Sequence, residues 1–354
     1  MKLDIWANIA AEFKDTLVLG NGASIAVHKG FRYSSLFDKA HENGWISSGG
    51  QAVFDNAANK DFEFVLRCLS IARFVNEALD IRDSKTDSVY KETRSALIRT
   101  VRAVHPSHSG IKHHLEPAYE FMEQFNTVVS LNYDLLVYWA MMEAIEAAPE
   151  EHGNGSRTPP FKDCFSELDG GFSMNCFRTE FQRHKSRLVF YPHGGLFLAS
   201  RPDGAEYKVK ATDTANLLDE IVKTWEPDSG SPLFVAEGNS KQKMAAISRS
   251  PYLSTVYYDV LPNLGPNVAI YGWSLGENDE HILKQICKGA KKIAVSVFKE
   301  NEEDLNGHCS QVKNQIAKVK RSIDVFFYDA KSQGCWIQPS TGQEATGVPQ
   351  PVST

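Results

Sequence analysis

The stretch at residues 127–136 constrains the fold of this chain more than any other. Its β-branched start is typical of a buried strand, and the apolar run that continues to Ala148 is long enough for a helix. Asn132 and Asp134 stand between the two, where the carboxyl end of a parallel strand faces the ligand crevice of an open α/β sheet. Asp134 is suited both to capping the helix and to contacting a ligand, and these two interpretations stay open. Capping does not account for Asn132, whose amide offers two donors and one acceptor.

Strand-like and helix-like segments alternate along the chain, and polar loops follow the strands. This pattern predicts an α/β fold with a doubly wound, mostly parallel, Rossmann-like sheet that carries helical and loop insertions. The predicted strands lie at 15–19, 127–130, 187–192, 232–235, 267–271, 292–298 and 323–328, and the predicted helices at 61–104, 135–148, 243–260 and 311–320. Four of the loops carry candidate ligand groups, and together they fit one elongated ligand that crosses the top of the sheet.

The first of these loops is a glycine turn made by Gly20, Asn21, Gly22, Ala23 and Ser24. Gly20 and Gly22 permit a tight turn and the close approach of a ligand, and the helix that follows presents free N–H groups to a phosphate. The dinucleotide fingerprint requires a third glycine three positions after Gly22, where this chain has Ile25, so the ordinary dehydrogenase pattern fails. A purely structural turn, with Ser24 as a helix cap, is the alternative.

The other candidate ligand groups are an arginine, a histidine and a second glycine-serine loop. Arg32 is placed to clamp a pyrophosphate, although a solvated surface arginine is the alternative. His193 ends a strand beside two glycines, and an imidazole pKa near neutrality suits a general base. A histidine that hydrogen-bonds the backbone of a turn is the competing interpretation. Gly272 and Ser274 occupy the last loop.

Composition excludes several classes of function. The formal net charge of −6 argues against a dedicated nucleic-acid binder, so no direct nucleic-acid partner is expected. The start of the sequence has no signal peptide pattern and no apolar run can span a bilayer, so we expect a cytoplasmic protein without membrane contact. The six cysteines form no C-x-x-C pair, which predicts free thiols and no metal. The histidines at 105, 108, 113 and 114 lack H-E-x-x-H spacing, so we expect them to be solvated or capping.

One domain is expected over residues 1–335. It carries a helical insertion at about 55–120 and two polar insertions, at 149–186 and 199–230, which are rich in glycine, proline, serine and charge. Residues 336–354 have the composition of a disordered tail.

The four loops, in this order, resemble those of the SIR2-like (sirtuin-fold) NAD-binding family. Residues 20–24 resemble its G-A-G-x-S phosphate turn with Asn21 in place of alanine, and residues 130–134 resemble its T-x-N-x-D loop. His193 and Gly194 resemble its H-G pair, and residues 272–274 resemble its G-T-S loop. Residues 30–32 faintly resemble the loop that carries the family's phenylalanine and arginine. Protein deacylases of the family have a zinc ribbon with two C-x-x-C pairs, and this chain has none. The phrase at 271–279 is instead similar to the bacterial antiphage branch.

The resemblance implies an NAD+ hydrolase that releases nicotinamide and ADP-ribose and that depletes NAD+ during phage infection. NAD+ is then the substrate, with Asn132 and His193 catalytic. The residues expected to contact it are Gly20, Asn21, Gly22, Ala23, Ser24, Arg32, Asp134, Gly272 and Ser274. The alternatives are an NAD-dependent protein deacylase and a non-catalytic sensor of NAD+ or ADP-ribose. An activating or inhibiting partner protein or nucleotide ligand is expected, as is an oligomer, because an unrestrained NADase harms its host.

Overall fold

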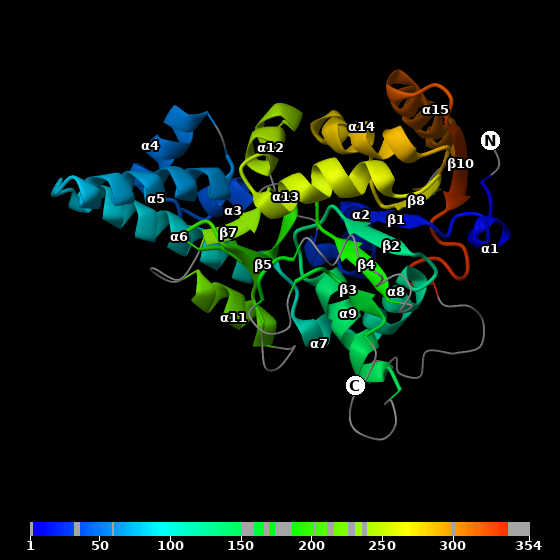
Figure 1. Ribbon diagram of the computed structural model, residues 1–354, viewed down its shortest axis with the longest axis horizontal. Coiled ribbons are helices and arrows are strands. Elements are labelled where there is room, and N and C mark those ends of the chain that lie inside the picture. Colours follow the sequence, from blue (N-terminus) through cyan, green and yellow to red (C-terminus); the bar gives the residue numbers. More distant parts are fainter. Residues whose placement is uncertain are drawn as a thin grey trace, which may run out of the picture.

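A seven-stranded, all-parallel sheet forms the centre of the computed structural model (Figure 1). The structure describes residues 3–31, 36–58, 60–149, 159–165, 170–173, 186–201, 203–210, 216–225, 231–235, 239–298 and 302–338. The strand order is β10-β9-β8-β1-β2-β4-β3, and all six pairings are parallel. The strands are β1 (Thr16–Leu19), β2 (Thr127–Ser130), β3 (Phe161–Lys162), β4 (Arg187–Phe190), β8 (Asn267–Tyr271), β9 (Lys292–Val297) and β10 (Asp324–Asp329). The doubly wound α/β prediction is therefore confirmed.

The central strands are apolar on both faces because helices cover the sheet on both sides. All four residues of β1 are buried, and so are the last four residues of β8. Helices α8 (Leu115–Met122) and α9 (Leu136–Ala147) lie on one side of the sheet, whereas α14 (Glu280–Gly289) and α15 (Glu302–Val319) lie on the other (Figure 1). This arrangement follows from right-handed crossovers, since the strand order runs in opposite directions on the two sides of β1.

A group of helices separates β1 from β2, where the sequence predicts a helical insertion. Its members are α3 (Leu36–Glu42), α4 (Ser48–Ala57), α5 (Phe62–Ala78), α6 (Ser84–Val104), α7 (His108–Ile111) and α8. The helical stretch predicted at 61–104 is formed by α5 and α6, which are separated where Asp83 caps α6 by accepting hydrogen bonds from the N–H groups of Lys85 and Thr86. Phe62, Val65, Leu66 and Leu69 face the core at the predicted helical spacing.

A second, antiparallel sheet packs beside the first, with the order β6-β5-β7. Its strands are β5 (Gly194–Ser200), β6 (Glu206–Lys208) and β7 (Ser231–Phe234). The sequence predicts the strand near 232–235 but not its separation from the main sheet. Because β4 and β5 are joined by only three residues, His193 is held between the two sheets.

The two polar insertions and the tail are only partly described. Residues 150–158, 166–169, 174–185, 202, 211–215, 226–230 and 339–354 lie outside the described residues. Within the first insertion the structure has β3, and within the second it has β6 and α11 (Leu217–Thr224). Trp336, which the sequence places in the tail, is buried and donates an indole hydrogen bond to the Ala23 carbonyl at 2.9 Å. Its packing therefore carries the folded domain past residue 335.

The cysteines differ in part from the predicted free thiols. Cys164 is disulfide-bonded, whereas Cys287, Cys309 and Cys335 are free. Sequence spacing identifies close C-x-x-C pairs but not cysteines that only the fold brings together, which is why the sequence predicts a free thiol at Cys164. Among the described helices, none combines the length and the apolar composition that crossing a bilayer requires.

Candidate active site

The candidate site lies where the strand order reverses. β1 pairs with β2 on one side and with β8 on the other, so the loops after these strands meet at one edge of the sheet. β4 follows β2, which brings His193 to the same edge. Ligands of open α/β sheets bind at this kind of switch point. All four predicted loops are therefore at one place in the fold.

The glycine turn packs against the loop after β8. The N–H of Gly20 donates to Tyr271, that of Gly22 donates to Gly272 at 2.7 Å, and that of Ala23 donates back to Gly20. Gly272 has a φ of +70°, and a Cβ atom built on it would lie 2.2 Å from the backbone nitrogen of Ala23. The glycines thus allow two loops to touch. Since these three N–H groups already have protein acceptors, they do not form the open phosphate cradle that the sequence predicts.

Asn132 is held by its amide nitrogen in a fixed orientation. Nδ2 donates to the Gly20 carbonyl at 3.0 Å and to the Ser24 hydroxyl at 2.9 Å. Both amide hydrogens are therefore used inside the protein, and Oδ1 is the remaining polar atom of the side chain. Asn132 is 6% exposed, so this oxygen is held in a nearly dry environment.

Ser24 and Asp134 hold Asn132 in that orientation through a chain of hydrogen bonds. The buried Ser24 hydroxyl also hydrogen-bonds the carboxyl of Asp134, and Asp134 Oδ1 accepts the N–H of Leu136 at 2.9 Å. Burial raises the pKa of Asp134 to about 6, while these two hydrogen bonds lower it. Asp134 therefore caps the start of α9, as one of the two interpretations predicts. It also fixes the hydroxyl that fixes Asn132.

His193 has protein partners on both sides of its ring. The ring hydrogen-bonds the backbone of Leu131, the residue before Asn132, which joins the two predicted catalytic residues. Nε2 lies 3.2 Å from Nε2 of His281 and 3.8 Å from Oδ1 of Asp279. Burial, followed by the nearby charge of Lys243, lowers the pKa of His193 to about 3. The ring is therefore neutral at pH 7.

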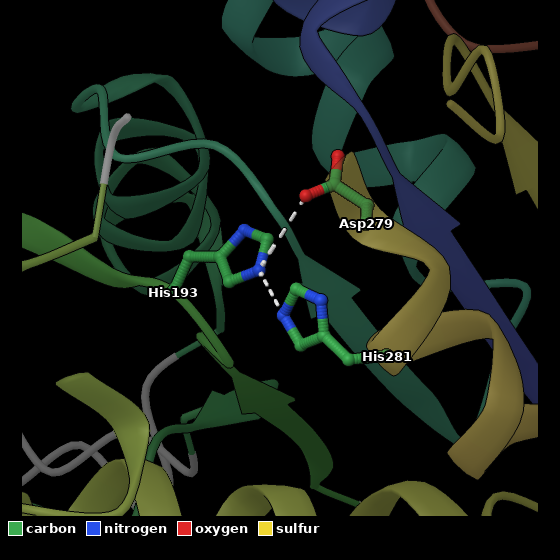
Figure 2. Close-up of side chains that lie close together, drawn as sticks. All are labelled: His193, Asp279 and His281. Atoms are coloured by element: carbon green, nitrogen blue, oxygen red, sulfur yellow. Dashed lines mark hydrogen bonds and ion pairs between the residues drawn. The ribbon is translucent and has the colours of Figure 1, made fainter. Parts of the chain in front are cut away.

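Three residues that the sequence does not single out belong to the site. His281 and Asp279 lie beside His193 (Figure 2), and Lys243 contacts Asp279. Lys243 of α12 (Ser240–Ile247) forms an ion pair with Asp279, in which Nζ lies 2.7 Å from Oδ1. Nδ1 of His281 lies 3.1 Å from the Ser240 hydroxyl. Burial lowers the pKa of His281 to about 4. The available signal was an Asp and a His directly after the glycine-serine loop, where α14 begins.

Ser274 and Asn21 do not belong to this buried hydrogen-bonded cluster. Ser274 is exposed at the start of the loop after β8, and Asn21 is exposed at the start of α2 (Asn21–Val27). Arg32 lies outside the described residues. His105 is buried rather than solvated, and its Nε2 accepts the N–H of Leu135, at the start of α9, at 3.1 Å, which agrees with the capping alternative. Burial lowers the pKa of His105 to about 4.

The fold and site together define a Rossmann-like α/β protein with a cluster of buried polar side chains at the switch point of its parallel sheet. The chain belongs to the family described as a domain of unknown function (DUF4917), whose model matches residues 17–336. No curated protein matches the chain. Solved structures do match, and one was reported as "Structural Basis for the Mechanism and Regulation of Sir2 Enzymes". It is 14% identical, the alignment covers 89% of this chain and 96% of that one, and the TM-score is 0.32. At that similarity the chemistry rests on the residues of this chain.

Proposed function

We propose that the protein hydrolyses the nicotinamide–ribose bond of NAD+ and releases nicotinamide and ADP-ribose. The observation that carries the proposal is the fixed amide of Asn132 at the switch point. The ring of His193 hydrogen-bonds the backbone of Leu131, the residue before Asn132. A side chain that is used only for packing does not need a buried serine and a buried carboxyl to set its orientation. The order of the four loops in the sequence, which resembles that of NAD-binding proteins, names the ligand.

Asn132 orients the reacting groups in this proposal. Cleavage of the bond builds positive charge on the ribose carbon, as in glycoside hydrolysis. Nicotinamide leaves as a neutral molecule, so no strong general acid is required. The site must hold the ribose and a water in position, and a fixed Oδ1 can accept a hydrogen bond from either.

His193 accepts a proton from a ribose hydroxyl or from the attacking water. Proton transfer of this kind contributes roughly 10²–10⁴-fold to a rate. The ring is neutral, but with a pKa of about 3 it is a weak base in the described state. Bringing the negative pyrophosphate of NAD+ near Lys243 and His193 would raise that pKa, because a nearby anion stabilises the imidazolium.

The rest of NAD+ lies along the neighbouring loops. The exposed amide of Asn21, next to the N–H groups that are already bonded, offers donors to the pyrophosphate, with Arg32 as a second candidate. Gly272 and Ser274 face the adenosine end. Among the described residues, the buried indole N–H of Trp273, between them, has no hydrogen-bond partner. A buried donor without an acceptor is unfavourable, and a ligand oxygen or ring nitrogen would satisfy it.

The enzyme is, in this proposal, a restrained effector of antiphage defence that depletes NAD+ only when activated. The described state supports restraint, since His281 and Asp279 surround Nε2 of His193. A substrate proton must displace those partners before His193 can accept it. An activating partner or nucleotide ligand would act by opening this contact.

Direct product analysis tests the proposal. Purified protein is incubated with NAD+, with and without lysate from phage-infected cells, and nicotinamide and ADP-ribose are separated by chromatography. The proposal predicts equal amounts of both products from the activated wild type and at least hundredfold slower release of both from Asn132→Ala. Consumption of NAD+ only with an acetylated peptide would establish the deacylase alternative. Saturable NAD+ binding without turnover under every condition would establish the sensor.

A further inference from the structure

We propose that His193, Asp279 and His281 form a binding site for one divalent transition-metal ion of the Zn²⁺ type. Metal binding here would be a property separate from NAD+ hydrolysis, because it depends on the geometry of the three side chains and not on their role in that reaction. It also replaces the expectation of no metal, which considered cysteine pairs and H-E-x-x-H spacing alone. In the fold the three residues are brought together from β4–β5 and from the start of α14 (Figure 2).

The distances between the three residues suit a shared ion. One ligand atom from each residue lies within 4.8 Å of the other two. Nε2 of His193 is 3.2 Å from Nε2 of His281 and 3.8 Å from Oδ1 of Asp279. Two ligands about 2.0–2.2 Å from one tetrahedral ion are about 3.3–3.6 Å apart. The two separations from His193 lie within a few tenths of an ångström of that range, and the Asp279–His281 separation, at most 4.8 Å, would shorten by up to about 1 Å on binding.

Each imidazole is also oriented by a second partner, as metal-bound histidines are. The His193 ring hydrogen-bonds the Leu131 backbone, and Nδ1 of His281 lies 3.1 Å from the Ser240 hydroxyl. Such partners fix the ring so that the other nitrogen points at the metal. Both Nε2 atoms point toward one place between the rings. Both histidines are 3% exposed, whereas the Asp279 side chain is 23% exposed, so the site has one open side.

The charges present define which ion is accepted. Two imidazoles and one carboxylate are ligands for Zn²⁺ and similar ions, whereas Mg²⁺ prefers an all-oxygen set. Lys243 competes, because its ammonium already binds Oδ1 of Asp279 at 2.7 Å. Metal binding must displace Lys243 from that oxygen, and removal of the ammonium should therefore strengthen it.

Metal binding and proton transfer use the same atom of His193. An ion held by Nε2 removes the lone pair that the proposed hydrolase needs, so Zn²⁺ would inhibit the reaction. This consequence rests on the proposed function, but the binding itself does not. A binding measurement without NAD+ therefore separates the failure of one proposal from the failure of the other.

The test is a Zn²⁺ titration of the full chain, stripped with a chelator and measured against a chromophoric competitor at pH 7. We expect one Zn²⁺ per wild-type chain and at least tenfold weaker binding by His281→Gln and by Asp279→Asn. Lys243→Met should bind at least tenfold more tightly. His308→Gln, which changes an exposed histidine of α15, should match the wild type. Mg²⁺ should not compete at a hundredfold excess.

Three results would overturn the inference. Absence of Zn²⁺ binding by both the wild type and Lys243→Met would show that the cluster is a hydrogen-bonded network alone. Unchanged affinity in folded His281→Gln and Asp279→Asn would place the ion elsewhere. Equal weakening by His308→Gln would indicate surface binding. Circular dichroism establishes folding for each variant, and a ligand variant that does not fold is replaced in the comparison by the other.

Discussion

The side-chain amide of Asn132 donates a hydrogen bond to the hydroxyl of Ser24 at 2.9 Å, across 108 positions of the sequence. Ser24 in turn hydrogen-bonds Asp134, so two loops of adjacent strands share one polar chain. The sequence predicts a phosphate contact or a helix cap for Ser24. In the structure its hydroxyl is buried and connects the other two side chains. Because Ser24 holds the amide of Asn132, it is a positioning residue for the proposed reaction.

Ser24→Ala should lower turnover more than the loss of a single hydroxyl group suggests. The substitution leaves one amide hydrogen of Asn132 and one acceptor of Asp134 without a partner. This should lower the unfolding free energy by about 1–3 kcal/mol. A freed Asn132 amide also positions its oxygen less well, and we expect roughly a tenfold lower kcat. Thermal melting and nicotinamide release measure the two effects. Ser248→Ala, at an exposed serine of the segment after α12, is the control, and an equal effect there would contradict the positioning role.

The stability of the protein should depend on pH through Asp134. Its folded pKa of about 6 lies above the ordinary aspartate value of 3.8, because burial disfavours the charged form. The stabilising contribution is thus complete below about pH 4 and is lost as the pH rises through 6. Asp134→Asn removes this titration. Its unfolding free energy relative to wild type should rise between pH 4 and pH 7, by up to roughly 3 kcal/mol for two pKa units. Urea unfolding measures it, and a difference independent of pH would contradict the buried carboxyl.

Gly272→Ala should destabilise the domain severely. The residue has a φ of +70°, and its added Cβ would lie 2.2 Å from the backbone nitrogen of Ala23, which cannot move without disturbing the glycine turn. We expect a loss of at least ~3 kcal/mol, since both strain and a backbone clash contribute. Gly307→Ala is the matched control, because a Cβ there meets nothing within 4 Å inside α15. It should stabilise by about 0.5–1 kcal/mol. Equal effects of the two substitutions would show that the loops are not in contact.

Resting activity should be low in the isolated chain. His281 and Asp279 surround Nε2 of His193, which leaves the proposed base without access to a substrate proton. Expression in a bacterial host should therefore leave NAD+ near its normal level until phage infection or an activating partner is supplied. Measuring cellular NAD+ with and without infection tests this. Constitutive depletion by the wild type, with Asn132→Ala harmless, would retain the hydrolase and exclude the restraint.

The sequence predicts the sheet and the four loops because both depend on local patterns. The β-branched run at 127–129 and the glycines after β1 are readable from a few neighbouring residues. The contacts among His193, Asp279 and His281 join segments 86 to 88 residues apart, and no local pattern reports them. The same limit applies to the N–H groups of the glycine turn, whose acceptors lie in the loop after β8. Sequence thus indicates which loops meet, and the structure determines which groups are already used.

Nicotinamide release from NAD+ by matched wild-type and Asn132→Ala proteins, both activated by lysate from phage-infected cells, tests the central claim most directly. The account predicts stoichiometric nicotinamide and ADP-ribose from the wild type. It predicts at least a hundredfold slower release from Asn132→Ala, because the fixed Oδ1 is lost. The two proteins should melt within a few degrees of each other, since losing the hydrogen bonds of one buried amide shifts the Tm of a domain of this size only modestly. Full activity of an equally stable Asn132→Ala protein would contradict the account.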